Sequence, residues 1–243
     1  MFPPSAGAAG FRRRISLTVV SLQRGSRQVF ESLTLELHES RIGLIGDNGA
    51  GKSSLFRLIA GLDQPQQGSV SVHGLDTRAD RHQLPRHIGL MFQNPEDQII
   101  FPTVAEEVAF SLTARGMKRP AAREQALAFL QARGLGDWAG RAISELSQGQ
   151  RQQVCLAALQ IGEPSTLLLD EPYASLDLPS QQKLRAQLQA SDQQIILSTH
   201  VLDHVRDFER AVWLEQGRVR ADGPAREVCE AYTQDVRQRA SHA

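Results

Sequence analysis

The sequence lacks several features that would assign it to a particular class of protein. Only two of its 243 residues are cysteines, Cys155 and Cys229, and no short spacing joins them into a disulfide or metal-binding pattern. No run of about 18 apolar residues is present, so we expect no membrane-spanning helix in it. We therefore expect two buried free thiols, with any contact to a membrane made through partner proteins.

An excess of charge of either sign is also absent. Lysine plus arginine and aspartate plus glutamate number 27 each. A balanced chain has no electrostatic footprint for general nucleic-acid binding, so nucleic acid is not an expected partner. The opening residues are rich in small residues, proline and glycine, and lack the basic-then-apolar order of a signal peptide. We expect a flexible tail at 1–14 and a C-terminal tail at 236–243.

The sequence begins its ordered part with two segments typical of β-strands. Ile15, Leu17 and Val19 alternate with polar residues, and a second apolar pattern covers 28–37 after a Gly-Ser turn. Apolar patterns on both sides of a turn predict an antiparallel β-layer.

The rest of the sequence mixes buried strands with helices. The short apolar runs 166–169 and 194–197 are typical of parallel strands that are covered on both faces. From roughly 103 to 160 the strand pattern is lost and several helical patterns follow one another. We therefore expect an α/β core with a helical segment inserted into it.

A glycine-rich segment follows the apolar run 42–45 and precedes a helical pattern. It matches GxxxxGK[ST], and we expect the following residues to bind nucleotide: Gly46, Asp47, Asn48, Gly49, Ala50, Gly51, Lys52, Ser53 and Ser54. Glycines let backbone N–H groups approach the β-phosphate, and the helix N-terminus presents positive potential to it. We expect Lys52 to reach the β- and γ-phosphates and Ser53 to bind Mg²⁺. The motif predicts binding of ATP with Mg²⁺.

Two adjacent acidic residues end the apolar run 167–169. Asp170 is placed to support Mg²⁺ beside Ser53, and Glu171 is placed to orient or deprotonate an attacking water. An acidic pair at a strand end is on its own a common feature of solvated loops. Together with the phosphate loop, and with a later strand that ends near His200, the pair predicts a hydrolytic site.

A further motif precedes the helical pattern at 151–159 and consists of Leu146-Ser147-Gln148-Gly149-Gln150. Taken alone, Ser-x-Gly-Gln before a helix is a capping pattern. Together with the phosphate loop and the acidic pair, this segment resembles the LSGGQ signature of the ABC ATPase family. The resemblance extends over roughly 15–232. It implies that Ser147, Gly149 and Gln150 serve the nucleotide held by a second, identical or homologous ATPase subunit.

The same resemblance implies roles for other residues. Gln93 matches the glutamine that contacts Mg²⁺ and water, and His200 matches the histidine that contacts the γ-phosphate. Asp177 lies in a segment similar to the D-loop beside the nucleotide. ABC ATPases often stack an aromatic side chain from the first β-layer on adenine. None is present there in this sequence, and we expect the guanidinium of Arg24 to stack on the base instead.

The family resemblance implies a P-loop NTPase fold with a RecA-like α/β core, an N-terminal antiparallel β-subdomain and an inserted α-helical subdomain. We expect one ATPase domain over 15–235, with the helical subdomain at about 94–160. Single-domain length favours the transport branch of the family. Within it, Phe-Gln-Asn-Pro-x-Asp-Gln at 92–98 is similar to the ATPases of energy-coupling factor importers, which take up vitamins and transition-metal ions.

The closing segment 211–224 is most similar to the biotin-transport ATPases of that group. The implied partners are a second ATPase subunit, a transmembrane coupling protein and a substrate-binding membrane protein, at the cytoplasmic face of the inner membrane. A soluble, non-transport ABC ATPase acting on nucleic acid or on a protein assembly stays open as the alternative. A free-standing P-loop kinase is disfavoured by the signature and by His200.

Overall fold

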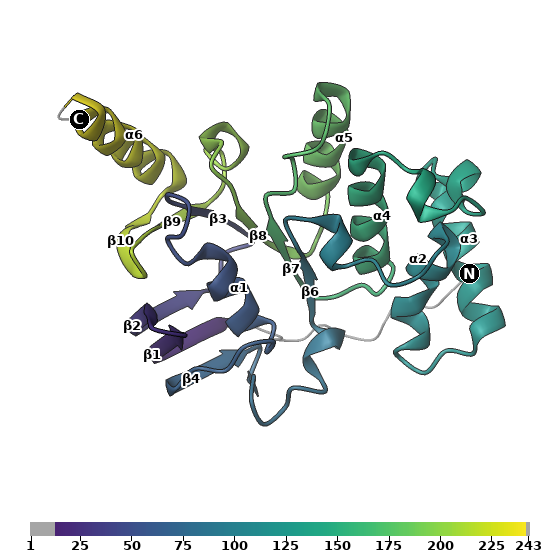
Figure 1. The fold of residues 1–243 in the computed structure, drawn as a ribbon, viewed down its shortest axis with the longest axis horizontal. Helices are drawn as coiled ribbons and strands as arrows, with labels where there is room; N and C mark the ends of the chain where they lie inside the picture. Colours follow the sequence, from purple (N-terminus) through teal and green to yellow (C-terminus); the bar gives the residue numbers. More distant parts are fainter. Residues whose placement is uncertain (1–12, 242–243) are drawn as a thin grey trace.

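The computed structural model describes residues 13–241, which form two sheets and the helices around them (Figure 1). One sheet is antiparallel, has the order β2-β1-β4-β5, and consists of β1 (Ile15–Arg24), β2 (Arg27–Leu37), β4 (Gln67–Val72) and β5 (Leu75–Asp76). It confirms the expected antiparallel layer. Most of the tail predicted at 1–14 lies outside the described residues.

The second sheet forms the core and has the order β10-β9-β3-β8-β7-β6. Its strands are β3 (Arg41–Ile45), β6 (Ile88–Met91), β7 (Thr166–Asp170), β8 (Gln194–Ser198), β9 (Arg210–Glu215) and β10 (Arg218–Gly223). All neighbours pair in parallel except β10, which forms a hairpin with β9. This order confirms the expected buried parallel strands.

Alternate residues of the core strands pack on opposite faces. Leu168 and Ile196 belong to the apolar cluster that includes α1 (Lys52–Ile59) and the antiparallel sheet. Leu167 and Ile195 face the cluster formed with α5 (Leu178–Gln189) and α6 (Ala225–Ser241). The core sheet is therefore covered on both sides, as its continuous apolar strands require.

Three helices lie between β6 and β7 and form the inserted helical subdomain. They are α2 (Val104–Thr113), α3 (Arg119–Ala132) and α4 (Gln148–Gln160), and they share an apolar cluster of their own. Figure 1 shows this subdomain at the opposite end of the molecule from α6. Single turns of 3₁₀-helix occur at Leu84–Arg86, Pro95–Asp97, Gly136–Trp138, Ile143–Glu145 and Leu202–His204.

Both cysteines are buried and free, as expected. Burial raises the pKa of Cys155 to about 12, which leaves this thiol protonated at neutral pH. Within residues 13–241, no helix combines the length and the apolar character needed to cross a membrane.

Strand β1 contains a bulge at Val19. The strand pairing shifts register between Leu17 and Val20, and Val19 has a φ of 50° with 51% of its surface exposed. Such an extra residue in one strand turns the following side chains to the other face. Val20 is consequently the residue that is fully buried.

The structure places 236–241 of the expected C-terminal tail in α6, which continues to Ser241. An ion pair one turn apart joins Asp235 to Arg239 at 2.7 Å, and Arg239 contacts Asp47 of the phosphate loop. The segment has few apolar residues but good helix formers, so tertiary contacts can extend the helix through it.

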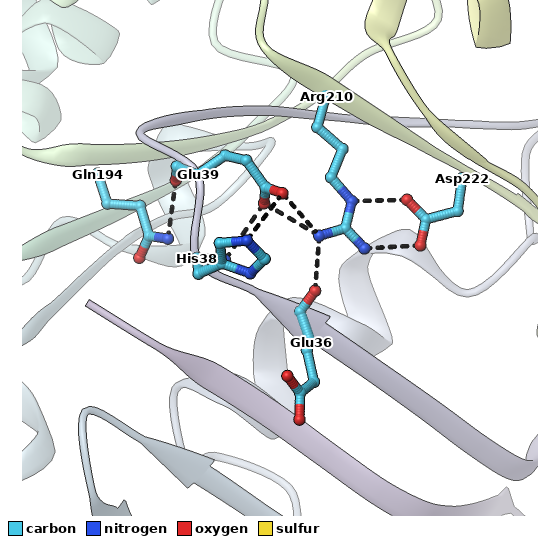
Figure 2. Close-up of polar contacts among 6 residues, drawn as sticks. All are labelled: Glu36, His38, Glu39, Gln194, Arg210 and Asp222. Atoms are coloured by element: carbon cyan, nitrogen blue, oxygen red, sulfur yellow. Dashed lines mark hydrogen bonds and ion pairs between the residues drawn. The ribbon is translucent and has the colours of Figure 1, made fainter. Parts of the chain in front are cut away.

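Arg210 joins the two sheets near the β2–β3 connection (Figure 2). Its guanidinium donates two hydrogen bonds to the Asp222 carboxylate, each 2.6 Å long, and one to the Glu39 carboxylate at 3.0 Å. It also donates to the backbone carbonyl of Glu36 at 2.8 Å. The bonds to Asp222, supported by those to Glu39, hold the pKa of Arg210 above its ordinary value. Four segments of the chain thus meet at one cation.

We expect Arg210→Gln to lower the free energy of unfolding by about 2 kcal/mol, because it leaves two partly buried carboxylates without their cation. Equilibrium urea unfolding measures the change. Arg218→Gln is the matched control, since the Arg218–Glu31 pair has exposed side chains (73% and 64%) and should contribute less than about 1 kcal/mol. Equal effects of the two substitutions would contradict this role of Arg210.

Candidate nucleotide site

The carboxyl ends of β3, β7 and β8 meet at one edge of the core sheet. The phosphate loop follows β3, the acidic pair ends β7 and His200 follows β8. A cleft of about 520 Å³ lies at this edge and is lined by Arg24, Arg27, Val29, Asn48, Gly49, Gly51, Lys52, Ser53, Ser54, Gln93, Asp170, Glu171 and His200. Open parallel sheets bind ligands at this position.

The phosphate loop has the backbone shape that its glycines permit. Gly46 and Gly51 have φ angles of 140° and 110°, in the region that favours glycine. A Cβ atom on Gly46 would lie 2.1 Å from the carbonyl oxygen of Leu214, so the loop packs directly on β9. Helix α1 begins at Lys52 without a side-chain cap. Its first N–H groups therefore remain available to an anion.

Lys52 is the cation at the centre of the loop. Only 8% of the residue is exposed, and its Nζ donates hydrogen bonds to the carbonyl oxygens of Gly46 (2.7 Å) and Asp47 (3.0 Å). Burial lowers the pKa of Lys52, while the charges of Glu171 and Asp170 act in the opposite direction. The ammonium group is thus held among oxygen atoms at the bottom of the cleft.

Asp170 is buried between two hydroxyl groups. The Ser53 hydroxyl donates to one of its carboxylate oxygens at 2.6 Å, and the Ser198 hydroxyl donates to the other. The prediction that Ser53 and Asp170 lie side by side is confirmed by this contact. Their oxygen atoms form a hard donor set of the kind that Mg²⁺ prefers.

Glu171 is the second buried acid of the cleft. Its carboxylate lies 2.9 Å from Nδ1 of His200, whose side chain is 64% exposed. The φ of Glu171 is 49°, and its backbone is fixed by hydrogen bonds with Ser198 (N–H to O, 3.0 Å) and Gln152 (3.4 Å). These contacts support the unusual conformation, which directs the carboxylate toward His200.

Four predicted residues lie apart from this cleft. Ser147, Gly149, Gln150 and Asp177 line a second cleft of about 540 Å³, between the start of α4 and the start of α5. Ser147 caps α4: its hydroxyl accepts from the Gln150 N–H (3.3 Å) and its own N–H donates to the Gln150 side chain (3.0 Å). One chain therefore carries the phosphate loop and the signature segment in two separate clefts.

Comparison with known proteins decides the family. The sequence model described as "ABC transporter" matches residues 30–174. The biotin transport ATP-binding protein BioM of Rhodobacter capsulatus is 48% identical over 218 residues, which cover 90% of this chain and 93% of that protein. The chain belongs to the ABC transporter family. It is an ABC transport ATPase, and ATP is the nucleotide that this membership implies.

Two further comparisons support the assignment to this family. BioM of Rhizobium etli is 37% identical over 208 residues, covering 86% of this chain and 92% of that protein. The ATP-binding cassette MJ0796, solved as a dimer in a post-hydrolysis state bound to ADP and Pi, superposes with a TM-score of 0.77 at 26% identity. That match covers 87% of this chain and 98% of the cassette. The predicted fold, an ABC cassette with a β-subdomain and a helical subdomain, is confirmed.

Three predicted residues of the ABC phosphate loop do not line the cleft. Gly46 and Ala50 are buried, and the Asp47 carboxylate is bound to Tyr232 and Arg239 of α6. In Gly46 and Ala50, only backbone atoms are placed to contact a nucleotide. The contribution of these residues to nucleotide binding therefore stays a prediction.

The cleft is also lined, beside the phosphate loop, by residues of the β-subdomain that sequence reasoning missed. Arg24 lines it, as predicted, but its guanidinium is paired with Asp63. Arg27 and Val29 of β2 line it too, and Arg27 donates to the carbonyl oxygen of Gly49 at 2.7 Å. No local motif marks these two residues, because the packing of two subdomains brings them to the cleft. The adenine contact predicted for Arg24 stays a prediction.

Proposed function

We propose that this ABC ATPase supplies energy to an energy-coupling factor importer for biotin, and that two ATPase subunits form its nucleotide sites. The observation that supports two subunits is the separation of the two clefts. The cleft of Lys52 holds the groups for phosphate and water, whereas Ser147 and Gly149 lie at the other cleft. Two chains arranged head to tail would join one cleft of each kind at every nucleotide, and the dimeric cassette MJ0796 supports this arrangement.

The side chains of the cleft fit ATP with Mg²⁺. Lys52 would bind the β- and γ-phosphates, while Ser53 and Asp170 would hold Mg²⁺ with the amide oxygen of Gln93, which lines the same cleft. When bound, the ion neutralises charge on the phosphate oxygens. Ser54 and Asn48, which line the loop side of the cleft, would add donors to the phosphates.

The acid at the end of β7 has the environment of a catalytic base. Glu171 is buried, accepts a contact from His200, and lies in the same cleft as Lys52. It would orient the attacking water and accept its proton, while His200 contacts the γ-phosphate and steadies the carboxylate. Asp177 caps α5 by accepting a hydrogen bond from the Ser180 N–H at 3.0 Å. The hydrogen bond with the Ser180 side chain, the largest cause, and that with its N–H lower the pKa of Asp177 and keep it charged beside the signature segment.

Removal of the Ser53 hydroxyl should abolish most of the increase in ATP affinity that Mg²⁺ produces. For Ser53→Ala we expect Kd for ATP to rise about tenfold with Mg²⁺ present and to change little in EDTA. Titration of both forms by calorimetry measures this. Ser54→Ala, at the neighbouring cleft residue, should keep the Mg²⁺ dependence of the unaltered chain. A Ser53→Ala variant with full Mg²⁺ dependence would exclude Ser53 as a ligand.

Removal of the Glu171 charge should separate binding from turnover. We expect Glu171→Gln to bind ATP as the unaltered chain does and to lower kcat by at least about 100-fold, because the amide cannot accept a proton. Steady-state phosphate release and equilibrium nucleotide binding measure the two quantities. Glu124→Gln makes the same change at an exposed position on α3 and should leave kcat unchanged. Normal turnover by Glu171→Gln would rule out its role as the base.

A groove beside the Gln93 segment supports a membrane partner. It measures about 500 Å³ and is lined by Glu96, Ile99, Ile100, Phe101, Pro102, Ala142, Ile143, Ser144 and Arg151. Ile100 is 68% exposed, and Phe101 packs on Phe110 with ring centroids 5.1 Å apart. We propose that a helix of the transmembrane coupling protein docks here, with a substrate-binding membrane protein completing the complex at the cytoplasmic face of the membrane.

The docking proposal predicts that Ile100→Glu reduces co-purification of a polytopic membrane protein and uptake of radiolabelled biotin. Nucleotide binding by the isolated chain should not change. Leu127→Glu, at a 40%-exposed leucine of α3 outside the groove, is the control and should retain both co-purification and uptake.

Uptake of cobalt or nickel instead of biotin would show that the transported substrate is a metal ion. ATPase activity stimulated by DNA or ribosomes, without a membrane partner, would favour a non-transport ABC ATPase.

A further inference from the structure

The C-terminal helix contacts the second residue of the phosphate loop. The Asp47 carboxylate accepts a hydrogen bond from the Tyr232 hydroxyl at 2.7 Å and one from the Arg239 guanidinium at 2.6 Å. These two residues lie 185 and 192 positions further along the chain. Asp47 does not line the nucleotide cleft, although its neighbour Asn48 does. The contact therefore holds one side chain of the loop outside the cleft.

The charge of Asp47 has the same sign as the phosphates that the loop would bind. The hydrogen bond from Arg239, the largest cause, and that from Tyr232 lower the pKa of this carboxyl group. It is consequently charged at neutral pH, and if turned toward the cleft it would repel a nucleotide. Arg239 both draws the carboxylate outward and neutralises it.

Asp47 also touches the cation of the loop through its backbone. Its carbonyl oxygen accepts hydrogen bonds from Lys52 Nζ at 3.0 Å and from the N–H of Ala50 at 3.1 Å. One residue thus contacts α6 with its side chain and Lys52 with its main chain. A rotation of Asp47 would move an acceptor of the Lys52 ammonium group.

The C-terminal helix is itself fixed against the core. Val228 and Cys229 are buried, and the Tyr232 ring packs edge-on against Trp213 of β9, with centroids 5.2 Å apart. The turn that precedes β10 reaches the loop as well, since the N–H of Gly217 donates to the carbonyl oxygen of Ala50 at 3.1 Å. Two consecutive C-terminal elements, the β9–β10 hairpin and α6, therefore support the phosphate loop from outside.

We propose that α6 braces the phosphate loop, with Tyr232 and Arg239 as positioning residues that hold the Asp47 carboxylate outside the cleft and so raise the affinity of the loop for nucleotide. This inference rests on the proposed role of the loop in binding ATP. Because Arg239 acts through a carboxylate, its contribution to affinity depends on that carboxylate being present.

A double-mutant cycle tests this dependence with Mg²⁺ and methylanthraniloyl-ADP, a fluorescent nucleotide, as the probe. We expect Arg239→Gln to raise Kd about threefold, a size consistent with a half-exposed ion pair. Tyr232→Phe, which removes only the hydroxyl, should raise Kd less. In an Asp47→Asn background the effect of Arg239→Gln should vanish. Arg237→Gln, at an exposed arginine on the same helix, should leave Kd unchanged.

Hydrogen exchange of the nucleotide-free chain gives a second readout that needs no nucleotide. The amides of 46–53 should exchange faster in Arg239→Gln and in Tyr232→Phe than in Arg237→Gln, while circular dichroism shows that helix content is kept. The brace is contradicted if Arg239→Gln weakens binding equally in the Asp47→Asn background, or if neither affinity nor exchange responds. An unaltered chain that fails to bind the probe contradicts the proposed function, and hydrogen exchange then decides the brace by itself.

Discussion

The parallel register of three buried strands determines where the groups of the nucleotide site lie. Leu44 of β3 and Asp170 of β7 both pair with Ser198 of β8, so the three strands end side by side. The phosphate loop follows β3 directly, Asp170 ends β7 and Glu171 comes next, and His200 lies two residues after β8. Groups more than 100 residues apart therefore share one cleft, as the hydrogen bond between Ser53 and Asp170 shows. A slip of one strand would separate them.

Burial makes the charges of this cleft interdependent. Lys52, Asp170 and Glu171 are each less than 9% exposed, so their interactions are screened less than those of surface pairs. Among residues 13–241, the Lys52 ammonium group donates to carbonyl oxygens and the Asp170 carboxylate accepts from hydroxyl groups. Such a set is suited to receive an anion and a divalent cation together. The signature segment, in the other cleft, would supply the remaining side of the site from a second chain.

Much of the fold could be predicted because its signals are local. The strand, loop and helix around Lys52 follow from apolar runs and glycine placement within 20 residues. The bulge at Val19 was missed because two consecutive valines, Val19 and Val20, can each continue the apolar pattern. The pairing of β1 with β2 and β4 shifts register there and buries Val20 instead of Val19. The end of α6 was missed for a related reason. Its stabilising contact, between Arg239 and Asp47, spans 192 residues and leaves no apolar pattern.

The residues of the candidate site also fall into those that a local motif predicts and those that depend on distant contacts. Residues within motifs, such as Glu171 and Gln93, lie where the motif predicts, in the cleft with Lys52. Arg27 and Val29 were missed because they reach the cleft only when the β-subdomain packs on the core. The side chain of Asp47 belongs to the motif, yet it faces α6 rather than the nucleotide. A motif specifies the path of the backbone well, but the direction of each side chain depends on its distant neighbours.

Under the proposed function, one chain holds two incomplete halves of a nucleotide site. The mass of the Glu171→Gln chain in solution, measured by light scattering with and without ATP and Mg²⁺, tests this arrangement. We expect a monomer without nucleotide, a dimer with it, and a monomer in both cases when Ser147→Arg is added, although that variant still binds ATP. A Glu171→Gln chain that stays monomeric with saturating ATP, or a dimer unaffected by Ser147→Arg, would contradict the composite site.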